Sequence, residues 1–267
     1  MKFFKLSGGL GNQLFIYSAA LAHSTENETV ILEGFETPRA LRTDRPAIAE
    51  LELAPGFILT QSRGSFQATR LLDFLNSQRR MNGAPTELGY VGTNSRFFHN
   101  NYFQTYKYFS SNLRAKFWIR HALGLPQAIE SPQAGTALHV RLGDYVNLRQ
   151  EFGLLSWKYY AAALDKIGHT EGAEVHVFSD DPEGAKTILS EEIKATFVFR
   201  EPAKSPVSDL KELATFRNLV ISNSSFSYWA GLVGDSNVFA PKKWFRSLRD
   251  PSDLHPPSWT LIESSWR

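Results

Sequence analysis

An arginine and two nearby polar residues stand where a predicted buried strand ends. The apolar run TALHVRL at 136–142 leads into GDYV, so that His139, Arg141 and Asp144 gather at the end of that strand. Open α/β sheets bind ligands at the carboxyl ends of their strands. A guanidinium offers a rigid, permanently charged fork that suits a diphosphate. The segment therefore predicts an anion site, and an Arg141–Asp144 ion pair that only holds the loop is the alternative.

A second polar segment, FSDDPEGAK at 178–186, follows the next predicted strand. We expect Asp181 to cap the helix that the following proline opens. Asp180 is then left to receive N–H donors from a base, or sugar hydroxyls. Two adjacent acids are weak evidence for a metal site, and we expect no metal here.

A third polar segment lies in ISNSSFSYWAGLVG at 221–234. Asn223, Ser224 and Ser225 stand at the start of a predicted helix, where hydroxyl and backbone N–H groups can converge on an anion. Ordinary helix capping is the alternative use of these residues. Because three successive strand ends are polar and one is cationic, the sequence predicts a site for a nucleoside diphosphate.

A glycine cluster, GGLGNQ at 8–13, joins a predicted strand to a predicted helix near the start of the chain. Gly9, Gly11 and Asn12 could bring backbone N–H groups to a phosphate at the helix N-terminus. A tight turn that needs glycine is an equal alternative. A dinucleotide fingerprint is disfavoured because Leu14 takes the place of its third glycine, and no Walker lysine follows.

These segments must be positioned by alternating strands and helices, a pattern typical of parallel sheets covered on both faces. In the second half we predict strands at 136–142, 173–180, 195–199, 218–225 and 237–241, with helices at 156–167, from 182, from 206 through Arg217, and from 226. In the first half we predict a strand at 2–8, a helix at 11–23 and a strand at 28–34.

The remainder of the first half is irregular in pattern. We expect loops with one helix near 66–79 across 34–85, and regular structure again at 86–92 and 101–109. The Pro- and Gly-containing stretch 123–135 is typical of a linker. The chain therefore divides into two predicted domains, 1–130 and 131–267.

Composition excludes several classes of protein. The 267 residues carry a net charge of +2 and no basic cluster, which argues against a nucleic-acid partner. Without Cys there are no disulfides, thiolate metal sites or cysteine nucleophiles. We find no signal peptide and no apolar run of about 20 residues, so we predict a cytoplasmic protein whose membrane association is at most peripheral.

Together the four polar segments resemble the α-1,2-fucosyltransferases of glycosyltransferase family 11. That family's motifs look like Gly-Gly-Leu-Gly-Asn-Gln, His-x-Arg-Arg-Gly-Asp-Tyr, Phe-Ser-Asp-Asp and Asn-Ser-Ser-Phe-Ser-x-Trp. This chain has their counterparts, in that order, at 8–13, 139–145, 178–181 and 223–229. The resemblance implies a GT-B type α/β fold, with two Rossmann-like domains facing across a cleft. Domain 1–130 would lie on the acceptor side, and domain 131–267 would bind GDP-fucose.

The resemblance also implies the reaction. Such enzymes transfer L-fucose from GDP-β-L-fucose, with inversion, to the 2-hydroxyl of a glycan, commonly a terminal galactose. A lipopolysaccharide or capsule repeat would be the acceptor, at the inner face of the cell membrane. A non-catalytic GDP-sugar-binding module, a fucosyltransferase of another linkage and an NAD-dependent oxidoreductase are the alternatives, and the oligomeric state is left open.

Roles for single residues follow from the same resemblance. Arg141 would stabilise the departing GDP without a metal, and Asp144 would either take the acceptor proton or orient Arg141. The other donor-binding candidates are Gly9, Gly11, Asn12, His139, Asp180, Asn223, Ser224 and Ser225. The chain departs from the family at Leu142, where most members carry a second arginine.

Overall fold

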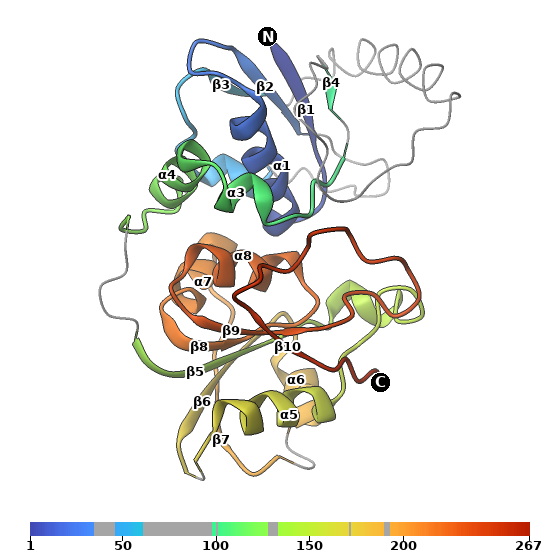
Figure 1. Ribbon diagram of the computed structural model, residues 1–267. Helices are drawn as coiled ribbons and strands as arrows, with labels where there is room; N and C mark the ends of the chain where they lie inside the picture. Colours follow the sequence, from blue (N-terminus) through green and yellow to red (C-terminus); the bar gives the residue numbers. More distant parts are fainter. Residues whose placement is uncertain (35–45, 61–97, 100, 128–132, 171, 190–192) are drawn as a thin grey trace. The chain divides into compact units, whose positions relative to one another are not determined.

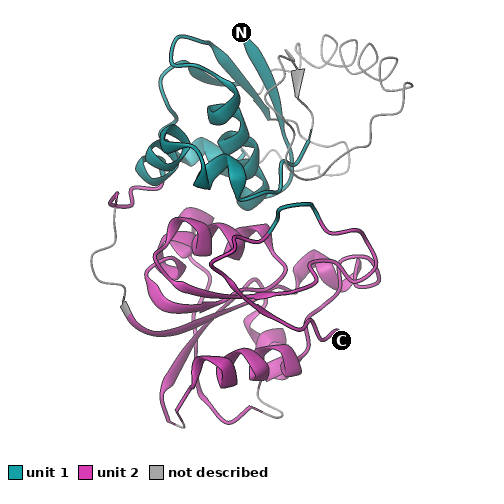
Figure 2. Ribbon diagram, viewed as in Figure 1, with its two compact units in different colours: residues 1–122, 251–254 teal, residues 123–250, 255–267 magenta. Residues whose placement is uncertain are grey.

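The protein consists of two compact units (Figure 2). The structure, a computed structural model, describes residues 1–34, 46–60, 98–99, 101–127, 133–170, 172–189 and 193–267. Unit 1 comprises Met1–Ala122 with Pro251–Leu254, and unit 2 comprises Leu123–Asp250 with His255–Arg267. The division thus falls before the boundary predicted at residue 130, and a short stretch near the C-terminus returns to unit 1.

Unit 1 is built on a parallel sheet of four strands in the order β3-β2-β1-β4 (Figure 1). Its strands are β1 (Lys2–Leu6), β2 (Val30–Gly34), β3 (Phe57–Thr60) and β4 (Phe98–His99). The strands predicted at 2–8 and 28–34 are confirmed. The expectation of loops and one helix across 34–85 was wrong at β3, which pairs with β2 although its surroundings are polar. The helix predicted near 66–79 and the structure predicted at 86–92 lie outside the described residues.

Helix α1 (Leu10–His23) is the centre of unit 1 and is buried over most of its length. Buried residues stand on every side of this helix, mostly apolar but with Gln13, Ser18 and His23 among them, which is typical of a helix covered all round. It packs against β1, the 3-10 turn η1 (Ala47–Glu50), α3 (Lys107–Ser110) and α4 (Leu113–Ala122). The Arg114 guanidinium of α4 donates to the carbonyls of Leu21 and Ser24, at 3.0 and 2.8 Å. A cation there satisfies the free carbonyls at the end of α1.

Unit 2 carries a parallel sheet of six strands in the order β10-β9-β8-β5-β6-β7. The strands are β5 (Gln133–Val140), β6 (Glu174–Ser179), β7 (Thr196–Phe199), β8 (Phe216–Val220), β9 (Asn237–Pro241) and β10 (Thr260–Ile262). The chain builds outward from β5 through β6 to β7, then returns to the other side of β5 at β8. This reversal between β5 and β8 is the switch point at which open α/β sheets hold ligands.

Helices cover both faces of the unit 2 sheet, with α5 (Trp157–Ile167) and α6 (Pro182–Leu189) on one and α7 (Pro206–Leu213) and α8 (Ser225–Val233) on the other (Figure 1). The predicted helix through Arg217 was too long. It ends at Leu213, the last apolar residue that α7 buries, and Arg217 lies in β8. Phe216 starts that strand because it is fully buried and pairs with the first residue of β5.

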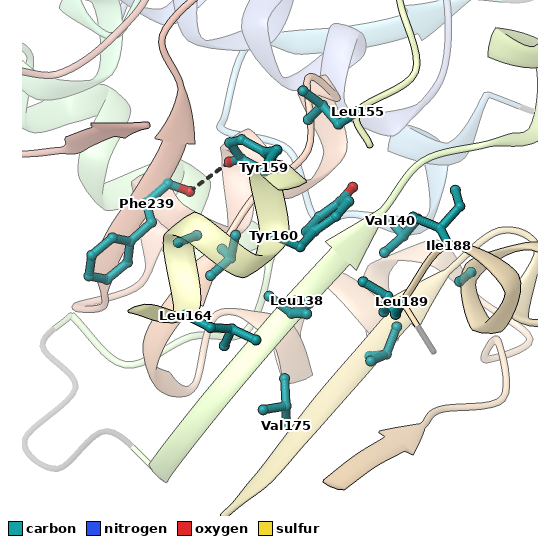
Figure 3. Close-up of a cluster of buried hydrophobic side chains, with 14 of the residues drawn as sticks. Leu138, Val140, Leu155, Tyr159, Tyr160, Leu164, Val175, Ile188, Leu189 and Phe239 are labelled. Atoms are coloured by element: carbon teal, nitrogen blue, oxygen red, sulfur yellow. Dashed lines mark hydrogen bonds between the residues drawn. The ribbon is translucent and has the colours of Figure 1, made fainter. Parts of the chain in front are cut away.

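The core of unit 2 lies beneath α5 (Figure 3). Tyr159 and Tyr160 are buried there among aliphatic side chains of β5, β6 and α6. The Tyr159 hydroxyl donates to the carbonyl oxygen of Ile221 at 2.6 Å and contacts that of Phe239 at 3.3 Å. A buried tyrosine needs such a partner, and this one ties α5 to the chain that leaves β8. Over the described ranges, every helix is too short or too polar to cross a bilayer.

Candidate active site

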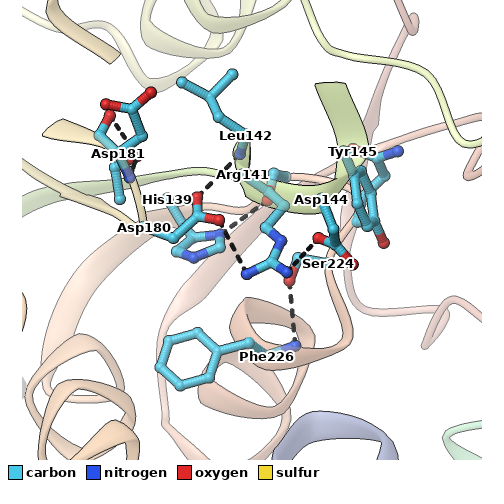
Figure 4. Close-up of polar contacts among 12 residues, drawn as sticks. His139, Arg141, Leu142, Asp144, Tyr145, Asp180, Asp181, Ser224 and Phe226 are labelled. Atoms are coloured by element: carbon cyan, nitrogen blue, oxygen red, sulfur yellow. Dashed lines mark hydrogen bonds and ion pairs between the residues drawn. The ribbon is translucent and has the colours of Figure 1, made fainter. Parts of the chain in front are cut away.

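Arg141 follows the last residue of β5 and lies between two carboxylates (Figure 4). Its Nη2 is 2.5 Å from Asp144 Oδ1, and its Nη1 is 3.1 Å from Asp180 Oδ2. The guanidinium points toward the start of α8, where Ser224 and Phe226 lie. The structure therefore brings together, at the switch point of the sheet, Arg141, Asp180 and Ser224, which the sequence placed after three different strands.

Asp180 holds the turn that carries Arg141. Its Oδ1 accepts the backbone N–H of Leu142 at 2.9 Å, while its Oδ2 faces Arg141. Gly143 makes this close approach feasible: its φ is +23°, and a Cβ there would lie 2.2 Å from Asp180 Oδ2. A hydrogen bond to a charged acceptor is stronger than one to a neutral acceptor. The sequence placed Asp180 at a strand end but gave no sign that its carboxylate is bound to the chain itself.

His139 is buried on β5, beside the guanidinium. Its Nδ1 lies 2.8 Å from the Ser222 hydroxyl, and its ring centroid is 5.5 Å from that of Phe226. Burial, reinforced by the positive charge of Arg141, lowers the pKa of His139 to about 3. The imidazole is therefore neutral at physiological pH and keeps both a hydrogen-bond donor and an acceptor.

Tyr145 was not among the predicted site residues, yet it supports Arg141. The guanidinium carbon lies 5.5 Å from the centroid of the Tyr145 ring, within the range of a cation–π contact. The hydroxyl donates to the carbonyl of Asn223 at 3.1 Å. Burial raises the pKa of Tyr145 to about 12, so the phenol keeps its proton. The spacing of four residues between Arg141 and an aromatic side chain was the sequence signal that could have identified Tyr145.

The three polar residues before and within α8 have different surroundings. Asn223 is buried, and its side-chain amide donates to the carbonyls of Phe152 and Gly153 at 2.9 and 3.3 Å. Ser224 is the N-cap of α8 and accepts the N–H of Phe226 at 3.4 Å, and Ser225 is the first residue of the helix. Asn223 thus holds the loop that leads to α5, while Ser224 lies near Arg141 at the N-terminus of α8 (Figure 4).

Leu142 stands at the position where the family resemblance implies a second arginine. Its side chain is buried in the core of unit 2 and points away from the guanidinium (Figure 4). It lies against Gly184 of α6, where an added Cβ would be 2.6 Å from a Leu142 methyl carbon. Position 142 therefore belongs to the core, and a charged side chain there would have to be buried or would displace α6.

The glycine cluster belongs to unit 1. Gly8 has a φ of +70°, and a Cβ there would lie 2.5 Å from the Asn12 amide nitrogen. Gly9 is the N-cap of α1 and is exposed, Gly11 is buried in the first turn, and Asn12 accepts a hydrogen bond from Gln104 at 3.2 Å. The glycine requirement of the turn is thereby established at Gly8. That this loop approaches a phosphate stays a prediction.

In the described part of the chain, His, Asp and Glu side chains form no cluster of three or more that could hold a metal ion. The site rests on Arg141 and on polar groups around it.

A family model matches residues 4–263, nearly the whole chain, and its description is glycosyl transferase family 11. The chain belongs to glycosyltransferase family 11. This confirms the family inferred from the four motifs, and it makes the protein a glycosyltransferase. The matched residues span both units, so the family assignment does not rest on one unit alone.

Relatives and solved structures agree with this. The chain is 26% identical to an α-1,2-colitosyltransferase of Escherichia coli, over 97% of this chain and 98% of that protein. It is 30% identical to the O-antigen biosynthesis glycosyltransferase WbnK of Escherichia coli, but this match covers only 46% of this chain and 43% of the relative. The α-1,6-fucosyltransferase NodZ, in a crystal soaked with GDP-fucose, shares the fold at a TM-score of 0.52 and 11% identity, over 90% of this chain and 95% of NodZ.

The fold class is thereby confirmed as α/β of the GT-B type, because both units have parallel sheets and the solved relative covers both. The arrangement of the two units across a cleft stays a prediction.

Proposed function

We propose that this protein transfers L-fucose from GDP-β-L-fucose to the 2-hydroxyl of a glycan acceptor, by a single displacement that inverts the anomeric centre. Unit 2 would bind the donor and unit 1 the acceptor. A galactose-terminated repeat of a lipopolysaccharide or capsule is the acceptor we propose, which is consistent with the O-antigen role named for WbnK.

The observation that carries the proposal is the position of Arg141. Its guanidinium lies at the switch point of the unit 2 sheet, directed at the N-terminus of a nine-residue helix. A fixed cation and a helix N-terminus both attract anions, and between them they would bind a diphosphate. His139 beside them is neutral, and because its Nδ1 already contacts Ser222, its Nε2 would be the ring nitrogen that contacts guanosine.

The reaction needs stabilisation of charge as the donor breaks. The acceptor oxygen attacks C1 of fucose, the bond from C1 to the β-phosphate oxygen breaks, and GDP leaves with that bond's electrons. Preorganised donors aimed at the developing charge are worth about 10²–10³-fold in rate. Arg141 would supply this stabilisation, with Ser224 and Ser225 at the start of α8 as further donors.

The acceptor hydroxyl must also lose its proton. Asp144 is the nearest exposed carboxylate to Arg141, with 63% of its side chain accessible. Either this carboxylate or a phosphate oxygen of the donor would take the proton. The 2.5 Å contact with Arg141 equally supports an orienting role for Asp144.

A second candidate donor is GDP-colitose. The full-length similarity to an α-1,2-colitosyltransferase favours it. Colitose is L-fucose without its 3-hydroxyl, so the chemistry proposed for Arg141 would serve both donors. A polar partner for the 3-hydroxyl would distinguish GDP-fucose from GDP-colitose, because a site built to hydrogen-bond a hydroxyl rejects an analogue that lacks it.

The test is GDP release from each donor, with and without a panel of galactose-terminated acceptors, paired with a GDP-binding titration. Acceptor-dependent release supports a transferase, and the preferred donor distinguishes fucose from colitose. GDP binding without release, across a wide acceptor panel, would support the non-catalytic module instead.

Arg141→Lys tests the role of the guanidinium. Lysine keeps the charge but loses the fork that contacts two groups at once. We expect turnover to fall by about 10²-fold while the protein stays folded. A near-normal rate in this variant would contradict the role of Arg141.

A further inference from the structure

Arg141 is surrounded by more negative charge than a phosphate site can keep. Its two nitrogen atoms Nη1 and Nη2 face Asp180 and Asp144, so the three side chains together carry an excess of one negative charge. A diphosphate approaching this group would be repelled unless one carboxylate moved away. The two carboxylates differ in how firmly each is held.

Asp180 is held in place. Its side chain is 26% exposed, one oxygen accepts the Leu142 N–H, and the other faces Arg141 across Gly143. Moving it would leave a backbone N–H without its acceptor, which is costly in a partly buried site. Asp180 therefore fixes Nη1 of the guanidinium.

Asp144 is held only lightly. It lies in the four-residue 3-10 turn η2 (Gly143–Val146), and its side chain is 63% exposed. Among the described contacts, its carboxylate bonds only to Nη2 of Arg141. An exposed ion pair of this kind contributes little free energy, so a diphosphate, with its greater charge, can replace it.

We infer that the Asp144 carboxylate occupies, in the unliganded enzyme, the position on Nη2 that a donor phosphate takes, and that donor binding displaces it while Asp180 stays. This rests on the proposed function only in that Arg141 must bind a diphosphate. Asp144 is then a competitor for the site, and its release frees a carboxylate beside the reacting centre once the donor is bound. Asp180 is a positioning residue.

The competition predicts an unusual result, namely that removing a site residue tightens binding. Titration calorimetry of GDP against Asp144→Asn should show affinity about two- to fivefold higher than wild type, which corresponds to about 0.4–1 kcal/mol, because an exposed ion pair of that strength no longer opposes binding. Guanosine, which has no phosphate, should bind both proteins equally. Asp144→Ser should behave as Asp144→Asn does, which guards against an effect of the asparagine amide.

Glu183→Gln is the matched control. It removes one acidic charge from unit 2, but Glu183 is 81% exposed and pairs with Lys186 instead of with Arg141. GDP affinity should be unchanged in this variant. An equal gain in Glu183→Gln would mean that net charge alone acts, and would overturn the inference.

Asp180→Asn tests the other half. The asparagine oxygen can still accept the Leu142 N–H. Its NH2 group then faces the Arg141 guanidinium, and because both groups are hydrogen-bond donors they cannot pair. We expect weaker GDP binding and a lower kcat, opposite in sign to the binding effect of Asp144→Asn. Unchanged or weaker GDP binding in folded Asp144→Asn would overturn the displacement. Failure of the wild-type protein to bind GDP at all would instead refute the proposed function.

Discussion

Replacing Gly143 by alanine should disturb the site through a single carbon atom. The new Cβ would lie 2.2 Å from Asp180 Oδ2, so this oxygen would have to move away by at least roughly 1.2 Å to reach ordinary van der Waals contact. The 2.9 Å bond from the Leu142 N–H to Asp180 would then be too long to count as a hydrogen bond. The pairing between Asp180 and Arg141 would be disturbed by the same movement.

The cost has two parts that can be separated. Losing a hydrogen bond to a charged acceptor costs about 1.5–3 kcal/mol, and a non-glycine residue at positive φ costs about 1–2 kcal/mol. Gly168→Ala is the matched control, because Gly168 also has a positive φ, of +73°, but no atom lies within 4 Å of the added Cβ. Only the backbone part should appear in that control.

Urea unfolding of both variants, with turnover measured in parallel, gives the answer. We expect Gly143→Ala to be less stable than Gly168→Ala by about 1.5–3 kcal/mol, and to lose most of its turnover while Gly168→Ala keeps it. If the two variants lose the same stability and both stay active, Asp180 does not hold the turn as described.

Two further predictions concern buried positions of unit 2. The unfolded chain takes up a proton at His139 near its ordinary pKa of about 6.5, whereas the folded chain does so only near its pKa of about 3. His139 should thus lower the free energy of unfolding by about 2 kcal/mol as the pH falls from 7.5 to 5. Unfolding measured across this range should show a smaller loss of stability in His139→Gln than in the wild type. The same dependence of stability on pH in both proteins would contradict a buried neutral imidazole. Leu142→Arg, which restores the arginine common in the family, should cost about 3 kcal/mol or more because it buries a charge in the core. If Leu142→Arg instead has the same melting temperature as the wild type, the side chain at position 142 can reach solvent.

Much of unit 2 was predictable because its signals are local. The helix at 156–167, the cap at Asp181 and the strands at 173–180 and 237–241 follow from periodicity and capping chemistry over a few residues, and each is confirmed. The strand β10 and the helix α4 were not predicted. β10 has only three residues and is stabilised by pairing with β9, a partner that the local sequence does not reveal.

The site itself was predictable only in part. Strand ends placed His139, Arg141 and Asp180 at one edge of a sheet, because parallel strands bring their carboxyl ends together. What a side chain does there depends on distances across the fold. Asn223 could equally have faced a ligand, but its amide donates to two carbonyls of a loop some seventy residues earlier in the chain. Tyr145 and Gly143 act through their packing around Arg141, and the sequence motif alone does not reveal these contacts.

The return of Pro251–Leu254 to unit 1 has a consequence for how the protein is made. Within unit 1, the carbonyl oxygen of Asp253 accepts a hydrogen bond from the Thr105 hydroxyl at 2.8 Å, and its carboxylate lies 2.8 Å from the Lys107 ammonium. A ribosome delivers Thr105 and Lys107 long before Asp253, at about 5–20 residues per second. Unit 1, which is synthesised first, therefore lacks these contacts until nearly all of unit 2 has been synthesised. The last contacts of unit 1 can form only after β5 to β9 of the unit 2 sheet have been synthesised, when β10 of that sheet is still to follow.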